Sequence, residues 1–252
     1  MNDRPAAAGV PPGQFPQSPV SAGHVEPVPR RVRALLGGST VVDSVQARYV
    51  WENAWYPQFY VPADDVDRDR LVHTGRLDDT HQPGAEALYL DGPDGLIPAG
   101  SFVADSANPL LAGTYRLEWD AFDAWFEEDE RVHGHPRSPF VRVDPVRSTR
   151  HVHVHVDGVT LAESNAPVAV FETGLPPRWY LDPTSVAWEH LVEIELRTLC
   201  PYKGRTTGYW AVEVGDRTID AAAWSYDFPI RQLTPIAGLV AFDDSSLTVD
   251  LD

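Results

Sequence analysis

Hydrophobic and polar residues alternate in short runs along most of the chain, which is the pattern of half-buried β-strands. Val152-His-Val-His-Val156 alternates, turns at Asp157-Gly158 and continues as Val159–Ala162, which predicts a hairpin. Tyr209–Val214 alternates in the same way and is followed by another turn. Proline and glycine interrupt the chain so often that little room remains for long helices. The pattern therefore predicts a mainly β fold.

One segment, residues 118–130, has a different period. Trp119, Phe122, Trp125 and Phe126 recur at spacings of three and four residues, and acidic residues occupy many of the other positions. This spacing predicts a helix, or a strand that runs into a helix. We expect the segment to act as a short helical linker between two halves of the chain.

The body of the chain contains an internal repeat. When residues 30–71 are moved by 120 positions onto residues 150–191 without a gap, eleven of the 42 aligned pairs are identical, Glu52 and Glu172 among them. Two units of roughly 100 residues are each large enough for a core of their own. We therefore predict a proline-rich disordered leader at residues 1–29, a first β domain at 30–130, a linker at 131–149 and a second β domain at 150–252.

The composition narrows the choice of partner. With 37 acidic against 20 basic residues the formal net charge is −17, which disfavours nucleic acid and anionic membranes, because both need a basic surface. A single cysteine excludes an internal disulfide and a multi-cysteine zinc site. No apolar run is long enough to span a membrane, and no secretory signal is visible. We expect an acidic cytoplasmic protein whose partner is a small molecule.

The lone cysteine and the lone lysine lie three residues apart, in Cys200-Pro-Tyr-Lys-Gly204. Pro201 and Gly204 predict a turn, and turns at strand ends commonly display reactive groups. An ammonium near a thiol favours the nucleophilic thiolate, so Cys200 is a candidate nucleophile. Lys203 could instead act as an amine nucleophile or bind an anionic group. In the structural alternative Cys200 is a small buried hydrophobe and Lys203 an exposed charge.

Polar and aromatic residues elsewhere in the second half extend this candidate site. Glu172 follows an apolar run and is a candidate general base, although its carboxylate could simply pair with Arg178. Aromatic side chains with a few polar groups are typical of a small-molecule pocket, and they also fill the cores of small β domains. The predicted catalytic residues are Cys200, Lys203 and Glu172, and the predicted ligand-binding residues are Arg178, Tyr180, Tyr202, Tyr209, Trp210, Trp224 and Tyr226.

A row of histidines raises the question of a metal. His151, His153 and His155 lie two residues apart, so in a strand all three side chains point to one face. Side chains two residues apart on a flat strand are about 6–7 Å from each other, too far for one tetrahedral ion unless the strand bends. We therefore expect a solvent-facing row of histidines, with no metal and no cofactor.

The ordered motifs of the second half resemble those of the domain-of-unknown-function 427 family. The resemblance lies in Phe171-Glu-Thr-Gly-Leu-Pro-Pro-Arg-Trp-Tyr180, Cys200-Pro-Tyr-Lys-Gly204, Ala223-Trp-Ser-Tyr226 and Ile236-Ala-Gly238. It covers residues 150–252 nearly throughout and the first half more weakly. It implies two tandem antiparallel domains of the β-tent kind, the fold of methionine-sulfoxide reductase B, Mss4-like and cereblon ligand-binding domains. By that analogy Trp210, Trp224 and the turn at Cys200–Lys203 would line a cleft between sheets.

The first half departs from these motifs. In the place of the Cys-Lys turn it has Leu77-Asp-Asp-Thr-His-Gln-Pro-Gly84, without thiol or amine, and near Phe102–Ser106 it lacks the Trp and Tyr. We therefore expect the working site in the second half. The favoured function is an enzyme that processes a small molecule in a Cys/Lys/aromatic pocket. The alternatives are a small-ligand-binding module without turnover and a structural or protein-interaction domain.

Overall fold

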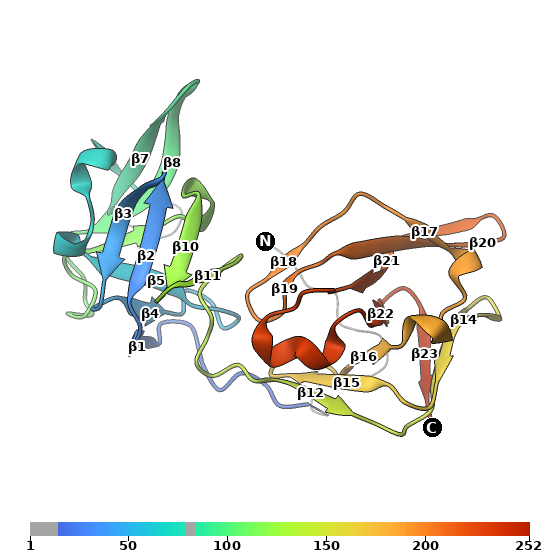
Figure 1. The fold of residues 1–252 in the computed structure, drawn as a ribbon. Helices are drawn as coiled ribbons and strands as arrows, with labels where there is room; N and C mark the ends of the chain where they lie inside the picture. Colours follow the sequence, from blue (N-terminus) through green and yellow to red (C-terminus); the bar gives the residue numbers. More distant parts are fainter. Residues whose placement is uncertain (1–14, 79–83) are drawn as a thin grey trace. The chain divides into compact units, whose positions relative to one another are not determined.

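The computed structural model describes residues 15–78 and 84–252, and the described chain forms two units (Figure 1). The N-terminal unit is Val20–Ser138, and the C-terminal unit is Pro139–Asp252 together with residues 15–19. Both consist of antiparallel sheets with short 3₁₀ helices, so the mainly β fold is confirmed. No helix of the described residues is long and apolar enough to cross a membrane.

The N-terminal unit contains a seven-stranded and a four-stranded sheet. In spatial order the larger sheet is β1 (Val25–Pro27), β4 (Arg48–Val50), β5 (Gln58–Pro62), β9 (Thr114–Leu117), β8 (Gly95–Val103), β7 (Glu86–Gly92) and β6 (Val72–Leu77). The smaller sheet is β11 (Glu130–Val132), β10 (Ala124–Glu127), β2 (Val32–Leu36) and β3 (Ser39–Ser44). Three 3₁₀ helices connect strands, η1 (Ala63–Asp65), η2 (Arg68–Arg70) and η3 (Trp119–Ala121).

The C-terminal unit repeats this order of strands. Its seven-stranded sheet is β12 (Val143–Arg147), β15 (Val168–Glu172), β16 (Arg178–Leu181), β22 (Val240–Phe242), β21 (Arg217–Ser225), β20 (Gly208–Val214) and β17 (Leu191–Glu193). A three-stranded sheet holds β14 (Val159–Ser164), β13 (Val152–Val156) and β23 (Thr248–Leu251), and a small ribbon holds β18 (Leu199–Cys200) and β19 (Gly204–Arg205). Its 3₁₀ helices are η4 (Pro183–Ser185), η5 (Trp188–His190) and η6 (Arg231–Ile236).

The segment at residues 118–130 is not a helix. After the single turn η3 the chain runs into the hairpin β10–β11, with Glu128 at a positive φ of 53° in the turn. Trp119 and Trp125 still meet, with ring centroids 5.1 Å apart, because a tight turn followed by an extended strand also brings them together. The helical linker predicted from the spacing is therefore wrong. β10 pairs with β2 and closes the N-terminal unit, as β23 pairs with β13 in the C-terminal unit.

The structure also moves the expected boundaries. Within the predicted leader β1 pairs with β4, and Val20 and Val28 lie in the core of the N-terminal unit. Within the predicted linker β12 pairs with β15. Alternation is weak in such short edge strands, which is why the sequence pattern does not show them. Residues 1–14 of the leader and part of Leu77–Gly84 lie outside the described residues.

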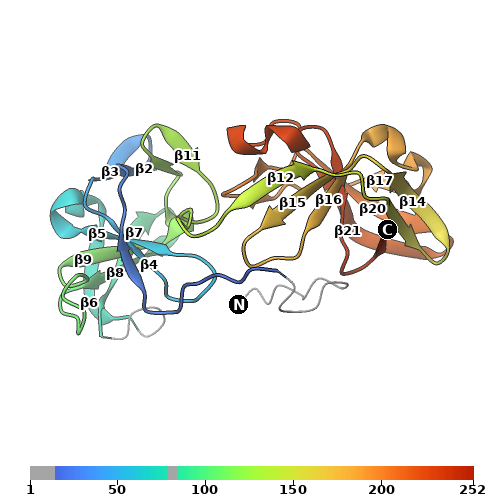
Figure 2. The same ribbon diagram turned by 90° about the horizontal axis from the view of Figure 1, so that it is seen from below.

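Each larger sheet packs one face against the smaller sheet of its unit. In the C-terminal unit Trp179 and Leu181 of β16 face this main core, together with Val240 and Phe242 of β22. Because side chains alternate along a strand, Tyr180 of β16 points to the opposite face. Figure 2 shows β12, β15 and β16 side by side in this larger sheet.

One glycine in the N-terminal unit permits a close approach of two strands. A β-carbon on Gly100 in β8 would stand 2.1 Å from the carbonyl oxygen of Arg116, and its φ is +139°. Gly95, in the same strand, has a φ of +123° but open space around it. Alanine at either position is strained because of the positive φ, and only Gly100→Ala adds a steric clash. We expect Gly100→Ala to lower the free energy of unfolding by about 1–3 kcal/mol more than Gly95→Ala, measured by urea denaturation. Equal effects would contradict the close approach.

Candidate functional site

The second face of the larger sheet in the C-terminal unit carries a separate apolar cluster. Its members are Val168, Val170, Tyr180, Tyr226, Leu233, Ile236 and Ala241, and Trp224 packs against them. Leu233 and Ile236 come from η6, which covers this face and contacts β12. The face therefore lies between the sheet and a loop region, away from the main core.

The Cys-Lys turn closes this region on one side. β18 pairs with β19 through Cys200 opposite Gly204, and Gly204 has a φ of +100°, which glycine adopts without strain. The carbonyl oxygen of Lys203 accepts a hydrogen bond of 3.0 Å from the backbone N–H of Ile230, directly before η6. The predicted turn is present, and this hydrogen bond attaches it to the segment that covers the sheet.

Lys203 and Glu172 form an ion pair at this face. The Lys203 Nζ donates to Glu172 Oε2, and the two side chains are only 12% and 9% exposed. Burial lowers the pKa of the Lys203 ammonium, but the nearby Cys200 sulfur, the Glu172 carboxylate and the Tyr180 hydroxyl outweigh it, and the net effect is a raised pKa. Lys203 is therefore an ammonium at neutral pH, which disfavours the amine-nucleophile interpretation in this conformation.

Three tyrosines lie in this region, of which Tyr180 and Tyr226 lie near the ion pair. Burial is the main cause of a raised pKa for Tyr180, Tyr209 and Tyr226. The charges of Cys200 and Lys203 act on Tyr180, and those of Cys200 and Glu172 act on Tyr226, so these groups lie within electrostatic reach of each other. All three hydroxyls are protonated at neutral pH and are available as hydrogen-bond donors.

The Tyr226 hydroxyl and the Cys200 thiol are further polar groups near the ion pair. Tyr226 is 5% exposed and belongs to the apolar cluster of this face. Cys200 is a free thiol of intermediate exposure, so its sulfur is neither sealed in the core nor fully in solvent.

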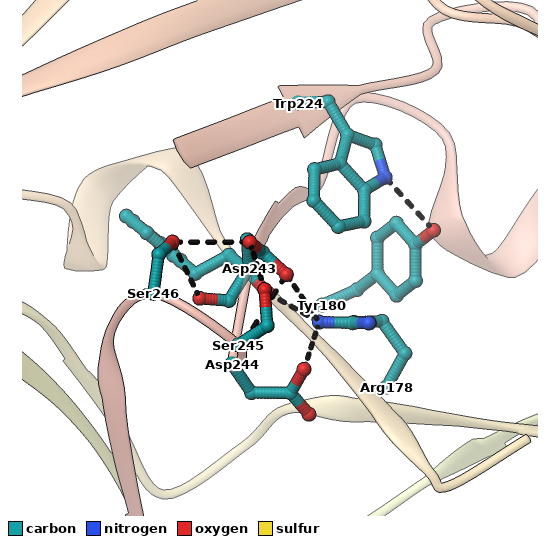
Figure 3. Close-up of polar contacts among 8 residues, drawn as sticks. Arg178, Tyr180, Trp224, Asp243, Asp244, Ser245 and Ser246 are labelled. Carbon is teal, nitrogen blue, oxygen red and sulfur yellow. Dashed lines mark hydrogen bonds and ion pairs between the residues drawn. The ribbon is translucent and has the colours of Figure 1, made fainter. Parts of the chain in front are cut away.

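Arg178 is held by protein groups. Its Nη1 donates to the carbonyl oxygen of Phe242 at 2.8 Å and to Asp244 Oδ1 at 2.7 Å (Figure 3). The guanidinium carbon lies 5.2 Å from the centroid of the Trp224 ring, and the Trp224 indole N–H donates to the Tyr180 hydroxyl at 3.4 Å. Arg178 thus positions Trp224, and Glu172 pairs with Lys203 rather than with Arg178. Asp244, whose pKa burial raises, was missed because only the fold brings it to Arg178.

The structure separates Trp210 from the other predicted site residues. In the ladder between β20 and β21, Tyr209 stands opposite Trp224, while Trp210 stands opposite Ala223 on the other face. Trp210 packs against the main core and makes an edge contact with Trp188, with ring centroids 5.2 Å apart.

Tyr202 lies half-buried in the Cys-Lys turn. A small depression where the two sheets meet is lined by Val154, Arg178, Trp179, Phe242, Asp244 and Val249, and it shares only Arg178 with the predicted site.

The equivalent face of the N-terminal unit is closed by an arginine. Glu52 and Tyr60 are the counterparts of Glu172 and Tyr180. The Tyr60 hydroxyl donates a hydrogen bond of 3.0 Å to the Glu52 carboxylate. Arg116 in β9 donates to Glu52 at 2.8 and 3.0 Å, and its side chain is 3% exposed. Arg116 stands opposite Tyr60 in the ladder, the place that Ala241 has opposite Tyr180. The same carboxylate is thus neutralised from a sheet strand in one unit and from the Cys-Lys turn in the other.

Comparison with known proteins identifies a family. A family model described as a domain of unknown function (DUF427) matches residues 24–86 and 144–252, which are parts of both units. No curated protein matches the chain.

Proposed function

Since the chain belongs to the DUF427 family, whose description assigns no activity, we propose from its own residues that the C-terminal unit acts on a small molecule. The proposed site is the sheet face beneath η6, with the Cys200 thiol as the reacting group. The observation that carries the proposal is the buried Lys203–Glu172 ion pair beside a partly accessible thiol. Buried ionisable groups of this kind concentrate at functional sites.

Each residue then has a chemical role. The Cys200 sulfur attacks an electrophilic carbon, a sulfur–carbon bond forms, the bond to the leaving group breaks, and the thiol proton passes to the leaving group. The Lys203 ammonium lies within electrostatic reach of the sulfur and stabilises negative charge on it during the attack, and Glu172 is a positioning residue that holds the ammonium in place. Tyr226 offers a hydroxyl donor, and Trp224, fixed by Arg178, offers a flat apolar wall.

The charge balance suggests the class of substrate. The ammonium and the carboxylate of the ion pair neutralise each other, and Arg178 is neutralised by Asp244. The three tyrosines are protonated, because burial raises their pKa values. A site of net neutral side chains with hydroxyl donors favours an uncharged polar molecule with an acceptor oxygen or nitrogen, because burying an unpaired charge there would be costly. We expect no nucleic acid and no membrane as partners.

Alkylation of Cys200 tests the proposal. The Lys203 ammonium acts electrostatically on the Cys200 sulfur and can stabilise the charge that the sulfur carries during attack on an electrophile. We expect native protein to react with iodoacetamide at pH 7 about tenfold faster than the same protein in guanidinium chloride, measured by intact mass. Cys200 is the single cysteine of the chain, so one added mass reports on it directly.

A variant at the Tyr226 hydroxyl separates the reactivity of the thiol from ligand recognition. Tyr226→Phe keeps the ring and removes only the hydroxyl, so the rate with iodoacetamide should change less than about twofold. Labelling of Cys200 only after denaturation would refute the nucleophile. The alternative of ligand binding without turnover is favoured instead if native labelling is no faster than denatured labelling but small polar ligands still slow it.

A further inference from the structure

The outer face of the three-stranded sheet carries a cluster of metal-ligating side chains. His153 and His155 of β13 and Asp250 of β23 each offer one ligand atom, and these atoms all lie within 4.8 Å of one another. The ring centroids of the two histidines are 4.8 Å apart, with an angle of 25° between the planes. Side chains two residues apart on a flat strand are about 6–7 Å from each other, so this closer approach removes the main objection to a metal.

An irregularity in the strand accompanies this close approach. The register between β13 and β14 shifts between Val154 and His155, and a bulge of this kind bends a strand and increases its twist. A tetrahedral ion with bonds of about 2.0 Å to nitrogen holds its ligand atoms about 3.3 Å apart. Ligand atoms within 4.8 Å of one another reach this spacing through changes of side-chain torsion alone.

The groups around the cluster favour a cation. His155 Nε2 lies 2.9 Å from Asp250 Oδ2, so a proton held there is the one that an ion would replace. His153 Nε2 lies 2.9 Å from Thr160 Oγ1, a partner that fixes the orientation of the ring. Glu163 stands opposite His153 in the neighbouring strand and adds negative charge.

His151 belongs to the same row but not to the cluster. Its Nε2 lies 2.8 Å from Glu163 Oε1 and its Nδ1 lies 3.6 Å from Asp252 Oδ2. The hydrogen bond to Glu163 is the main cause of its raised pKa. His151 is thus occupied by two carboxylates, which makes it a neighbouring control on the same face.

The equivalent face of the N-terminal unit carries arginines in place of histidines. Arg31, directly before β2, and Arg33 of β2 occupy the places of His151 and His153, and Phe126 of β10 occupies the place of Asp250. Arg31 donates to Asp43, and Arg33 lies 5.5 Å from the centroid of the Phe126 ring. Arginine cannot ligate a metal, so only the C-terminal unit offers neutral nitrogen donors here.

We propose that His153, His155 and Asp250 form a binding site for a divalent late first-row transition metal such as Zn²⁺, with water completing the coordination. Two imidazoles and one carboxylate suit zinc, cobalt, nickel or copper, and they discriminate against calcium and magnesium, which prefer oxygen ligands. The site lies on the three-stranded sheet, while Cys200 lies beneath η6 on the far face of the larger sheet, and it is independent of the proposed thiol chemistry.

Calorimetric titration of the tag-free full chain with ZnSO₄ tests the proposal. We expect one Zn²⁺ per chain, and we expect His153→Ala and His155→Ala each to weaken binding at least about tenfold. Asp250→Asn should also weaken it, whereas His151→Ala should change it less than about threefold. With CoCl₂, visible absorption bands that vanish in the His153→Ala/His155→Ala double variant would report the same donors.

Two results would overturn the site. The first is that a folded wild-type chain shows no saturable zinc binding when the zinc concentration is raised to that of the protein. The second is zinc binding of equal strength in wild type and in the His153→Ala/His155→Ala variant. Because these side chains lie on an exposed sheet face, thermal unfolding without metal should be the same in all variants within a few degrees.

Discussion

Replacing Lys203 by methionine should lower the free energy of unfolding by about 3–5 kcal/mol, because it leaves the Glu172 carboxylate without its cation in a site that water barely reaches. Methionine keeps the length of the side chain and removes the charge. The loss should be confined to the C-terminal unit, so it is best read by hydrogen exchange in peptides that contain β15 and β16, with urea denaturation as the global measure.

Two control variants test whether the loss of stability comes from the buried unpaired charge. Removing both charges with Glu172→Gln and Lys203→Met should restore most of the lost stability, because no unpaired charge then remains. Arg68→Met breaks an exposed pair with Asp64, in which the side chains are 53% and 96% exposed, and it should cost less than about 1 kcal/mol. A loss for Lys203→Met as small as that of Arg68→Met would show that the turn is not held by a buried ion pair.

Arg116→Met should destabilise the N-terminal unit by about 3–5 kcal/mol. Arg116 is 3% exposed and pairs with Glu52 and Glu118, so its removal leaves two carboxylates close together without a cation. Burial and the adjacent Glu52 both raise the pKa of Tyr60, so its hydroxyl stays neutral beside the carboxylates. Chemical denaturation followed by exchange in peptides from β5 and β9 would measure the loss.

The matched control is Arg33→Met in the same unit. Arg33 pairs with Asp129, whose side chain is 97% exposed, so the charge that loses its partner is fully hydrated. Its replacement should cost well under half of the loss seen for Arg116→Met. If the two variants were equally stable, Arg116 would not be the group that neutralises the buried Glu52.

The repeat and the β fold could be predicted because both depend on local alternation and on residue identity at a fixed offset. Val152–Val156 alternates cleanly, and it is a strand. The segment 118–130 misled the prediction, because a 3₁₀ turn followed by a strand also brings Trp119 and Trp125 together. One of its acids, Glu127, has a fully buried side chain that pairs with Arg30 and Arg137.

Parts of the site could be predicted and others depended on long-range register. Cys200 and Lys203 are neighbours in the sequence, so their proximity is a local property. The partner of Glu172 was less certain, because Arg178 is close in sequence and Lys203 is 31 residues away. Alternation alone assigns Tyr209 and Trp210 to opposite faces, but only the ladder with β21 shows that Tyr209 shares its face with Trp224. The separation of His153 and His155 depended on a bulge that the sequence pattern does not reveal.

The most direct test of a small-molecule site beside Cys200 is capture of fragments by disulfide exchange. Native protein is incubated with a set of small disulfide-linked fragments under mild reducing conditions, so that Cys200 and a fragment form a mixed disulfide and a small thiol is released. We expect intact mass to show a few uncharged polar fragments captured about tenfold more than the average, with this preference lost in denaturant and reduced by Tyr226→Phe. Uniform capture of all fragments by the native chain, or none, would contradict the account.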